Sequence, residues 1–591
     1  MADTSNHIFD TSLFKRLLDY VKPYKPVFIG SLFLVIGLAV FGAARPYVVQ
    51  MAIDEQVSKK EYTGFVLLIV VMLVLLLLEV VCNLLFIYYA SWLGQTVVKD
   101  VRIKLFDHML SFKMKYYNNS SVGVLITRAV TDMERIADIF GEGLFMIFSD
   151  ILKMLIVGAV MFYMNWKLSL IVFVTLPIIL YATKIFQKYM KRAFEEVRTE
   201  VANLNSFVQE RVTGMKILQL FSREQTEYEK FKVINERHTK GWLKTVWYNS
   251  IFFPIAEFLS SVTMGAVIWI GGLNVIFNET ATIGQLMAFM MFIPMMYRPL
   301  NQIANKFNTL QMGMVAADRV FKVLDTQSQI DDNGIEQAPH FKGDIAFKKV
   351  EFSYVPDEPV LKGISFEAKS GQTIAIVGAT GAGKSTIINL LSRFYDIKSG
   401  EILIDDTNIN NYTLASLRKQ IAVVLQDVFL FADTILNNIT LKDERITEAD
   451  VIQAAKDIGI HDFIMSLPNG YQYNVKERGV MLSSGQKQLI AFLRAYVTNP
   501  AILVLDEATS SIDAYSEQLI QKATEKITKN RTSIVIAHRL VTVQNADKIL
   551  VMDSGELVEE GTHLELIKKP DGYYKNLYEV QFTKVAQSLQ V

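Results

Sequence analysis

Six long apolar stretches in the first half of this chain restrict its fold more than any other feature. Each is long enough to cross a lipid bilayer. A segment in lipid must satisfy its own backbone hydrogen bonds, which at this length means a helix. The stretches lie near residues 27–50, 64–94, 140–164, 168–190, 247–276 and 283–308. The sequence therefore predicts an α-helical transmembrane domain of six spans, and the hydrophobic content of 51% over 591 residues agrees.

The charges between these stretches predict the orientation of the spans. Lys and Arg residues number seven in 96–138 and thirteen in 184–245, whereas the short connections contain only Lys59, Lys60 and Lys167. Positively charged connections stay on the cytoplasmic side. The two long polar regions are therefore expected in the cytoplasm, and six spans return the chain to the same side.

The second half contains a segment suited to a nucleotide triphosphate. Residues 378–385 read GATGAGKS, the pattern of a phosphate-binding loop. An apolar β-branched run, 373–377, precedes the loop as a buried strand, and 386–391 opens a helix. Backbone N–H groups of such a loop turn toward the phosphates, and the helix dipole favours their charge. The expected nucleotide-binding residues are Gly378, Gly381, Gly383, Lys384, Ser385 and Thr386.

Two adjacent carboxylates follow a second apolar strand. Residues 503–505 lead into Asp506 and Glu507. Asp506 suits a carboxylate linked to Mg²⁺, which Ser385 of the loop would also contact. Glu507 is placed to activate the water that attacks the γ-phosphate. The sequence thus predicts an α/β P-loop domain that binds ATP and Mg²⁺.

Composition and the N-terminal segment argue against several other classes. Lys plus Arg equal Asp plus Glu at 60 each, so no electrostatic footprint for nucleic acid is expected. The single cysteine, Cys82, excludes a disulfide within the chain and a thiolate metal cluster. The N-terminus resembles neither a signal peptide nor a transit peptide. Residues 8–22 instead form an amphipathic stretch that is expected at the membrane interface.

A short motif between the loop and the carboxylates carries a family resemblance. Leu482–Gln486 reads LSSGQ, one residue from the LSGGQ signature of ATP-binding cassette (ABC) proteins, and it precedes Asp506 at the family's spacing. Four further family positions hold the expected residues in the expected order, namely Tyr354, Gln426, Asp513 and His538. Over residues 10–585 the chain resembles bacterial ABC exporter half-transporters, of the multidrug and lipid-exporting kinds that include lipid A flippases.

The resemblance implies a role for each of these residues. Tyr354 would stack on adenine, and Gln426 would lie near Mg²⁺ and the attacking water. His538 would hydrogen-bond to the γ-phosphate, and Asp513 would link two nucleotide sites. The implied catalytic set is Glu507, His538 and Gln426, and the implied metal set is Ser385, Gln426 and Asp506. The signature residues Ser483, Ser484, Gly485 and Gln486 would contact ATP that a partner subunit holds.

The same resemblance implies a dimer in a bacterial inner membrane, because a signature segment completes a nucleotide site only across a dimer interface. The expected division is a transmembrane domain at 1–325, a linker at 326–344 and an ATPase domain at 345–585. Closure of two ATPase domains on ATP would pull on the intracellular helix ends near Tyr116–Val124 and Gly214–Glu224 and evert a substrate cavity.

Ser484 departs from the family pattern, which has glycine there. In heteromeric exporters an altered signature often faces a partner chain whose catalytic glutamate is replaced. A serine side chain is small, however, and a homodimer can accommodate it. Both kinds of partner therefore stay open, with the heterodimer slightly favoured.

Three ionisable residues within the spans, Glu79, Glu257 and Arg298, are candidates for a substrate cavity. A helix–helix hydrogen bond is the alternative for the glutamates, and a structural role is the alternative for Arg298. The spans contain no evident basic cluster, and the basic residues at one inner end are Lys184, Lys188, Lys191 and Arg192. This pattern favours export of amphipathic small molecules over a lipopolysaccharide flippase.

Two other functions use the same fold. One is an ATP-gated channel or regulatory subunit, which the intact Glu507 and His538 disfavour because a gate needs binding more than turnover. The other is an importer on the exporter fold, which six spans do not exclude. Membrane lipids and an apolar or amphipathic small molecule are the expected partners besides the second chain.

Overall fold

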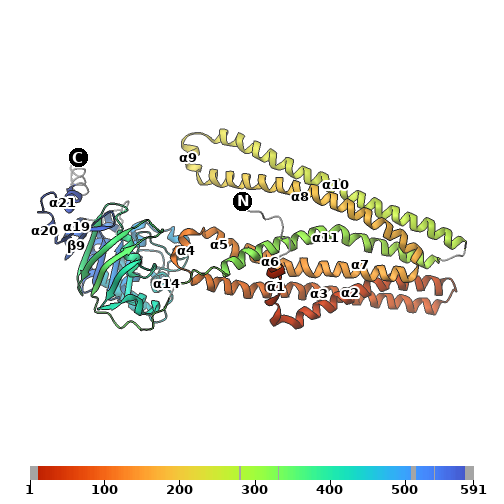
Figure 1. Cartoon of the computed structure of the whole chain (residues 1–591), viewed down its shortest axis with the longest axis horizontal. Coiled ribbons are helices and arrows are strands. Elements are labelled where there is room, and N and C mark those ends of the chain that lie inside the picture. Colours follow the sequence, from red (N-terminus) through yellow and green to blue (C-terminus); the bar gives the residue numbers. More distant parts are fainter. Residues whose placement is uncertain (1–10, 278–280, 331, 507–513, 538–539, 580–591) are drawn as a thin grey trace. The chain divides into compact units, whose positions relative to one another are not determined.

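The structure is a computed structural model that describes residues 11–277, 281–330, 332–506, 514–537 and 540–579 (Figure 1). The chain forms two compact units. The first comprises Met1–Leu110 and Ser120–Gln327, and the second comprises Ser111–Asn119 and Ser328–Val591. The described part of the first unit is helical, whereas the second unit contains the β-sheets. A short piece of the first polar connection, Ser111–Asn119, therefore packs with the second unit.

Long helices make up the first unit. They are α1 Thr11–Asp19, α2 Lys25–Met51, α3 Tyr62–Leu110, α5 Val122–Ala129, α6 Thr131–Asp138, α7 Phe145–Met164, α8 Trp166–Thr213, α9 Met215–Leu220, α10 Glu224–Ile276 and α11 Ile283–Leu324. Helix α4, Met114–Asn119, belongs to the second unit. One π-helical turn, Ala52–Val57, extends α2, and another, Ile139–Leu144, precedes α7.

Five helical segments of the described chain are long and apolar enough to cross a membrane. They are Lys22–Val57, Tyr62–Leu110, Val122–Met164, Trp166–Thr213 and Glu224–Ile276. These segments contain the first five predicted spans, which are thereby confirmed. The sixth predicted span, 283–308, is helical as the first part of α11, but α11 is not among the five. Its apolar stretch also contains Gln285, Arg298 and two prolines, which lower its hydropathy.

Helices α8 and α10 run side by side as a long pair that α9 joins at one end (Figure 1). The rings of Phe186 and Phe252 stack at 4.0 Å between centroids, and Lys244 pairs with Glu196 at 2.6 Å further along. The joint at α9 coincides with the second intracellular helix end expected from the sequence.

Helix α1 fulfils the expected amphipathic pattern near the N-terminus. Its Leu17 is fully buried. On the other face Arg16 donates two hydrogen bonds, of 2.7 and 2.6 Å, to the carboxylate of Asp325 at the end of α11. The Arg16 guanidinium also lies 4.3 Å from the Phe321 ring centroid. The interaction of Arg16 lowers the pKa of Asp325, so this bridge is charged at neutral pH.

The second unit contains two sheets. A four-stranded sheet has the order β2-β1-β4-β5, and a six-stranded sheet has the order β10-β9-β3-β8-β7-β6. The strands are β1 Ile345–Phe352, β2 Leu361–Ala368, β3 Thr373–Gly378, β4 Ser399–Ile404, β5 Thr407–Asn408, β6 Ile421–Val424, β7 Ile502–Asp506, β8 Thr532–Ile536, β9 Lys548–Asp553 and β10 Glu556–Gly561. The four-stranded sheet is antiparallel, and only β10 runs antiparallel in the larger one.

The central strands of the six-stranded sheet are apolar on both faces, as parallel strands covered on both sides must be. In β7, Leu503 and Leu505 join one hydrophobic cluster, whereas Ile502 and Val504 join the other. The helices that accompany the sheets are α12 Lys384–Leu391, α13 Leu414–Gln420, α14 Ile435–Thr440, α15 Glu448–Ile458, α16 His461–Met465, α17 Ser484–Val497, α18 Ala514–Thr528, α19 Leu540–Gln544, α20 His563–Leu566 and α21 Tyr573–Tyr578. This two-sided core fixes the strand ends that carry the site.

Candidate functional site

The predicted phosphate-binding loop connects β3 directly to α12. Gly378, Gly381 and Gly383 have φ angles of +154°, +86° and +95°, a region that favours glycine. Space requires glycine at two of them as well. A Cβ on Gly378 would collide with the carbonyl oxygen of Met552, and one on Gly383 would lie 2.8 Å from Cδ2 of Leu361. The loop is therefore a tight backbone cradle that ends at a helix N-terminus, the arrangement that binds phosphate.

Lys384, the first residue of α12, is 8% exposed. Its Nζ donates hydrogen bonds to the carbonyl oxygens of Gly378 at 2.8 Å and Ala379 at 2.9 Å. Burial lowers the pKa of Lys384, and the charge of Asp506 opposes that effect. The ammonium group thus lies across the mouth of the loop, where it can bind phosphate oxygens.

Asp506 ends β7 at the same edge of the sheet as the loop. The register pairs Asp506 with Ile536 of β8, and Ile536 with Ile376 of β3. The Asp506 carboxylate therefore lies two strands from the start of the loop, about 10 Å at ordinary strand spacing. Ser385, the second residue of α12, is exposed. A hydroxyl and a carboxylate are suitable oxygen ligands for Mg²⁺ that also binds nucleotide phosphates.

Tyr354 lies close to the start of α12, as a residue that stacks on a base should. Its hydroxyl group is 3.2 Å from Oγ1 of Thr386, and Asn389 donates to it at 3.1 Å. The ring packs edge-on against Phe352 and Tyr395, with centroid distances of 4.7 and 5.0 Å. These contacts fix the Tyr354 ring beside the phosphate loop.

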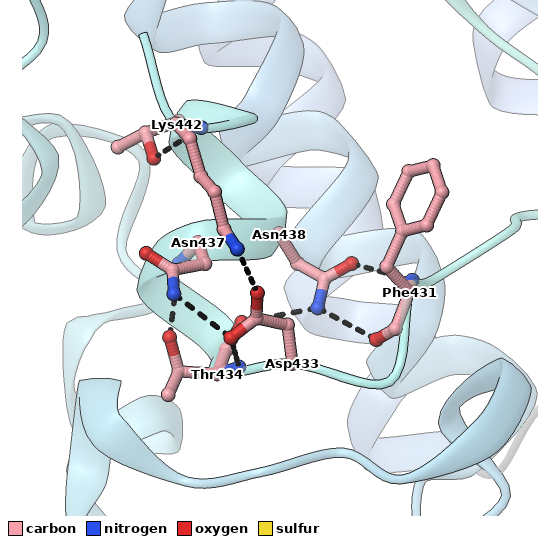
Figure 2. Close-up of polar contacts among 7 residues, drawn as sticks. Phe431, Asp433, Thr434, Asn437, Asn438 and Lys442 are labelled. Atoms are coloured by element: carbon pink, nitrogen blue, oxygen red, sulfur yellow. Dashed lines mark hydrogen bonds and ion pairs between the residues drawn. The ribbon is translucent and has the colours of Figure 1, made fainter. Parts of the chain in front are cut away.

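Gln426 is exposed two residues after β6, and the segment that follows it is held by a compact polar network (Figure 2). Asn438 is 1% exposed and binds three backbone groups. It accepts from the N–H of Phe431 at 2.8 Å and donates at 3.0 Å to the carbonyls of Phe431 and Thr434.

Asp433 is the charged member of the same network. It accepts from Asn437 at 2.8 Å and pairs with Lys442 at 2.9 Å. These contacts, the Asn437 hydrogen bond first, lower the pKa of Asp433 to about 2. The sequence analysis named Gln426 but missed this network, because two asparagines in a short helix carry no recognisable signal.

The signature segment begins α17. Ser483 is the N-cap, its hydroxyl accepts from the N–H of Gln486 at 3.3 Å, and the Gln486 side chain accepts from the N–H of Ser483 at 2.9 Å. This reciprocal capping box fixes the first turn. Ser484 is exposed and Gly485 is buried, so the Ser484 side chain is available to a ligand or partner at the helix N-terminus.

Three predicted site residues, Glu507, Asp513 and His538, lie outside the described residues. The described neighbours of two of them lie at strand ends of the same sheet, since Asp506 is the last residue of β7 and Ala537 follows β8. Among the described residues no three His, Cys, Asp or Glu side chains converge on one point.

The segment Ser111–Asn119 adds contacts that the sequence did not indicate. Lys113 pairs with Asp396 at 3.1 Å, and Asn118 donates to the Tyr395 hydroxyl at 2.7 Å. Tyr395 in turn packs against Tyr354. The first intracellular helix end that the sequence predicted, Tyr116–Val124, overlaps this segment. Through the side chain of Tyr395, this predicted helix end is therefore connected to Tyr354, the residue expected to stack on adenine.

The membrane-domain candidates are not brought together as one group. Glu79 on α3 pairs with Arg45 on α2 at 2.9 Å. Glu257 and Arg298 are exposed, and neither forms an ion pair with another described residue. A second intramembrane pair joins Asp150 of α7 to Lys306 of α11 at 2.6 Å. Apart from Glu79, the sequence analysis did not consider the charged residues in these contacts.

Comparison with known proteins agrees with both halves. Residues 28–300 match the family model described as the ABC transporter transmembrane region, and residues 361–510 match the one described as ABC transporter. The chain is 36% identical to YknV of Bacillus subtilis, an uncharacterized ABC transporter ATP-binding protein, over 96% of this chain and 94% of that protein. It is 36% identical to YgaD of the same organism, provisionally named a multidrug export ATP-binding/permease protein, over 96% and 99%.

A third relative is the ATP-dependent lipid A-core flippase of Syntrophus aciditrophicus, 33% identical over 96% of this chain and 94% of that protein. The matches cover the membrane helices and the ATPase domain in one chain. The protein is a multi-pass membrane protein with a cytoplasmic ATPase domain, and its ATPase activity is coupled to transport. The chain belongs to the ABC transporter family, as an exporter-type permease fused to its ATP-binding domain.

Proposed function

We propose that two half-transporter chains close on ATP and that this closure drives the export of amphipathic small molecules or lipids by alternating access. The observation that carries the proposal is the buried Lys384, whose Nζ lies across a glycine cradle in a chain that also has long apolar helices. ATP that contacts both ATPase domains favours the closed state, and its hydrolysis removes that preference.

Each residue of the site has one task in this scheme. Lys384 binds the β- and γ-phosphates, and the ring of Tyr354 stacks on the adenine. Ser385, Gln426 and Asp506 hold Mg²⁺, which supplies charge neutralisation at the phosphates when it is bound. Glu507 accepts a proton from the attacking water, and His538 hydrogen-bonds to the γ-phosphate. Asp513 links the two sites of the dimer.

The partner chain supplies the signature segment. The capping box of Ser483 and Gln486 leaves the exposed Ser484 at the start of α17, where the helix dipole favours a phosphate. The small Ser484 side chain is compatible with a homodimer. A heterodimer with a chain that lacks the catalytic glutamate is the other arrangement, slightly favoured by the altered signature.

The test is Glu507→Gln in the full chain, purified alone in lipid nanodiscs. The variant should bind ATP normally and hydrolyse almost none, and Glu517→Gln, an exposed carboxylate of α18, serves as the matched control. Unchanged turnover in Glu507→Gln would contradict the role of Glu507. The stoichiometry of the active particle separates the two kinds of dimer, since a chain that is inactive alone requires a different partner.

A lipid flippase and an exporter of soluble amphiphiles use the same cycle, and relatives of both kinds are similar to this chain. Transport assays with labelled lipid and with a labelled amphiphilic drug distinguish them. ATP-dependent accumulation in inverted vesicles establishes the outward direction, whereas efflux from those vesicles would indicate an importer.

A further inference from the structure

Two charged side chains approach one glycine inside the membrane domain, and a third charged side chain pairs with one of them. Gly42 of α2 is buried, and a Cβ placed on it would lie 3.4 Å from Oε1 of Glu79 and 3.7 Å from Cε of Lys153. The terminal methyl group of Met295 is also 3.7 Å from that point. Arg45, one turn further along α2, pairs with Glu79. We name Arg45, Glu79 and Lys153 the Gly42 cluster.

The cluster lies deep in the apolar segments. Glu79 is fifteen residues before the end of the predicted span 64–94, and Lys153 is eleven before the end of 140–164. At the helical rise these positions are about 22 and 16 Å from the span ends, near the middle of each span, whereas Arg45 is about 8 Å from the end of 27–50. Charged groups at that depth are expensive and are usually retained for function.

The hydrogen bonding of the cluster is incomplete. The Nε of Arg45 and the Oε2 of Glu79 are 2.9 Å apart, yet both atoms are buried without a directed hydrogen bond. The neighbouring pair Asp150–Lys306 differs, because Nζ of Lys306 donates to Asp150 at 2.6 Å. An ion pair that serves only to join helices would be expected to resemble the second pair.

The cluster also has a surplus positive charge. Arg45 and Lys153 are cationic and Glu79 alone is anionic, so the three residues carry a net charge of plus one. Lys153 has no carboxylate within 4 Å among the described residues. The free donors of Arg45 and the uncompensated Lys153 can both be satisfied by one anionic group.

We propose that the Gly42 cluster binds the acidic group, a phosphate or a similar anion, of an amphipathic substrate. The flexible side chain of Met295 provides adaptable apolar contact for the attached alkyl chain. The inference rests on the proposed export function and gives it a substrate class. It also removes the argument against an acidic headgroup that the lack of a basic cluster in the sequence had provided. The anion can come from a lipid headgroup or from a free amphiphile.

Native mass spectrometry of the full-length chain in detergent tests the proposal without ATP. The lipid arm compares phosphatidic acid with phosphatidylcholine, and the free arm compares dodecyl phosphate with dodecyltrimethylammonium. The chain should bind the anionic member of at least one arm about tenfold more tightly than its counterpart. The arm in which this preference occurs identifies the source of the anion.

Substitutions of opposite sign make the test specific. Lys153→Met should remove most of the anion preference, Lys153→Arg should retain it, and Glu79→Gln should strengthen anion binding several-fold because the net charge rises. Lys184→Met removes an exposed lysine of α8 outside the cluster and should leave the preference unchanged. The gain expected for Glu79→Gln keeps the test valid if Lys153→Met does not fold.

Two outcomes would overturn the inference. One is binding that does not depend on headgroup charge in either arm, and the other is an equal loss in Lys153→Met and Lys184→Met. Failure of the export function would instead leave anion binding intact while ATP-dependent transport was absent. The two failures are therefore distinguishable.

Discussion

Asn438→Ala should loosen the segment after Gln426 without disturbing the phosphate loop. The substitution removes three hydrogen bonds from a side chain that is 1% exposed. Each is worth about 1 kcal/mol net, so the local cost of losing all three is about 3 kcal/mol. Opening of this segment should therefore become roughly 100-fold more frequent.

Hydrogen exchange of the full-length protein measures that effect directly. Peptides that cover 427–440 should exchange roughly 100-fold faster at the Phe431 amide, while peptides over the loop at Lys384 stay unchanged. The maximal rate of ATP hydrolysis should fall, and the KM for ATP should change little, because Lys384 and Tyr354 keep their contacts. Asn437→Ala removes a single amide hydrogen bond to Asp433 (Figure 2) and is the matched control. Equal exchange in the two variants would refute the reasoning.

Three further perturbations probe other parts of the second unit. Gly383→Ala should raise the KM for ATP more than Gly381→Ala, because both have positive φ but only at Gly383 would the Cβ approach Leu361; equal effects would show that space at Gly383 is unimportant. Because the folded-state pKa of Asp433 is lowered to about 2, its stabilising effect should be complete above the unfolded pKa of about 4 and disappear as pH falls toward 2. Asp433→Asn should flatten that part of the acid-unfolding curve, and an unchanged curve would contradict the assignment. Asn118→Ala removes the hydrogen bond to Tyr395 and should speed exchange in 111–119 several-fold while ATP binding is unaffected; unaltered exchange would indicate that other contacts hold this segment.

The local elements were predictable because their signals are local. The glycine spacing of the loop predicted the β3–α12 turn, and the apolar runs predicted six spans, of which five are confirmed as long and apolar enough to cross a membrane. The sixth predicted span is helical within α11, but Arg298 and two prolines lower the hydropathy of its apolar stretch.

Contacts between distant residues were not predictable in the same way. Arg45 and Lys153 lie in separate apolar stretches, and only folding brings them to Glu79. Asn118 and Tyr395 likewise lie far apart in sequence. A residue that is unremarkable in its own segment becomes informative only when its neighbour is known. The absence of a basic run therefore did not exclude a basic site.

The membership of Ser111–Asn119 in the second unit has a practical consequence for recombination among relatives. The backbone N–H of Lys113 donates to the carbonyl of Ser328 at 2.7 Å, and the N–H of Ile330 donates to that of Ser111 at 3.1 Å. A chimera made by a single crossover near residue 328 would take residues 111–119 from one parent and the rest of this unit from the other. The two sides of these hydrogen bonds would then come from different parents. A functional exchange of ATPase domains should require two grafts, one at each place where the chain enters this unit.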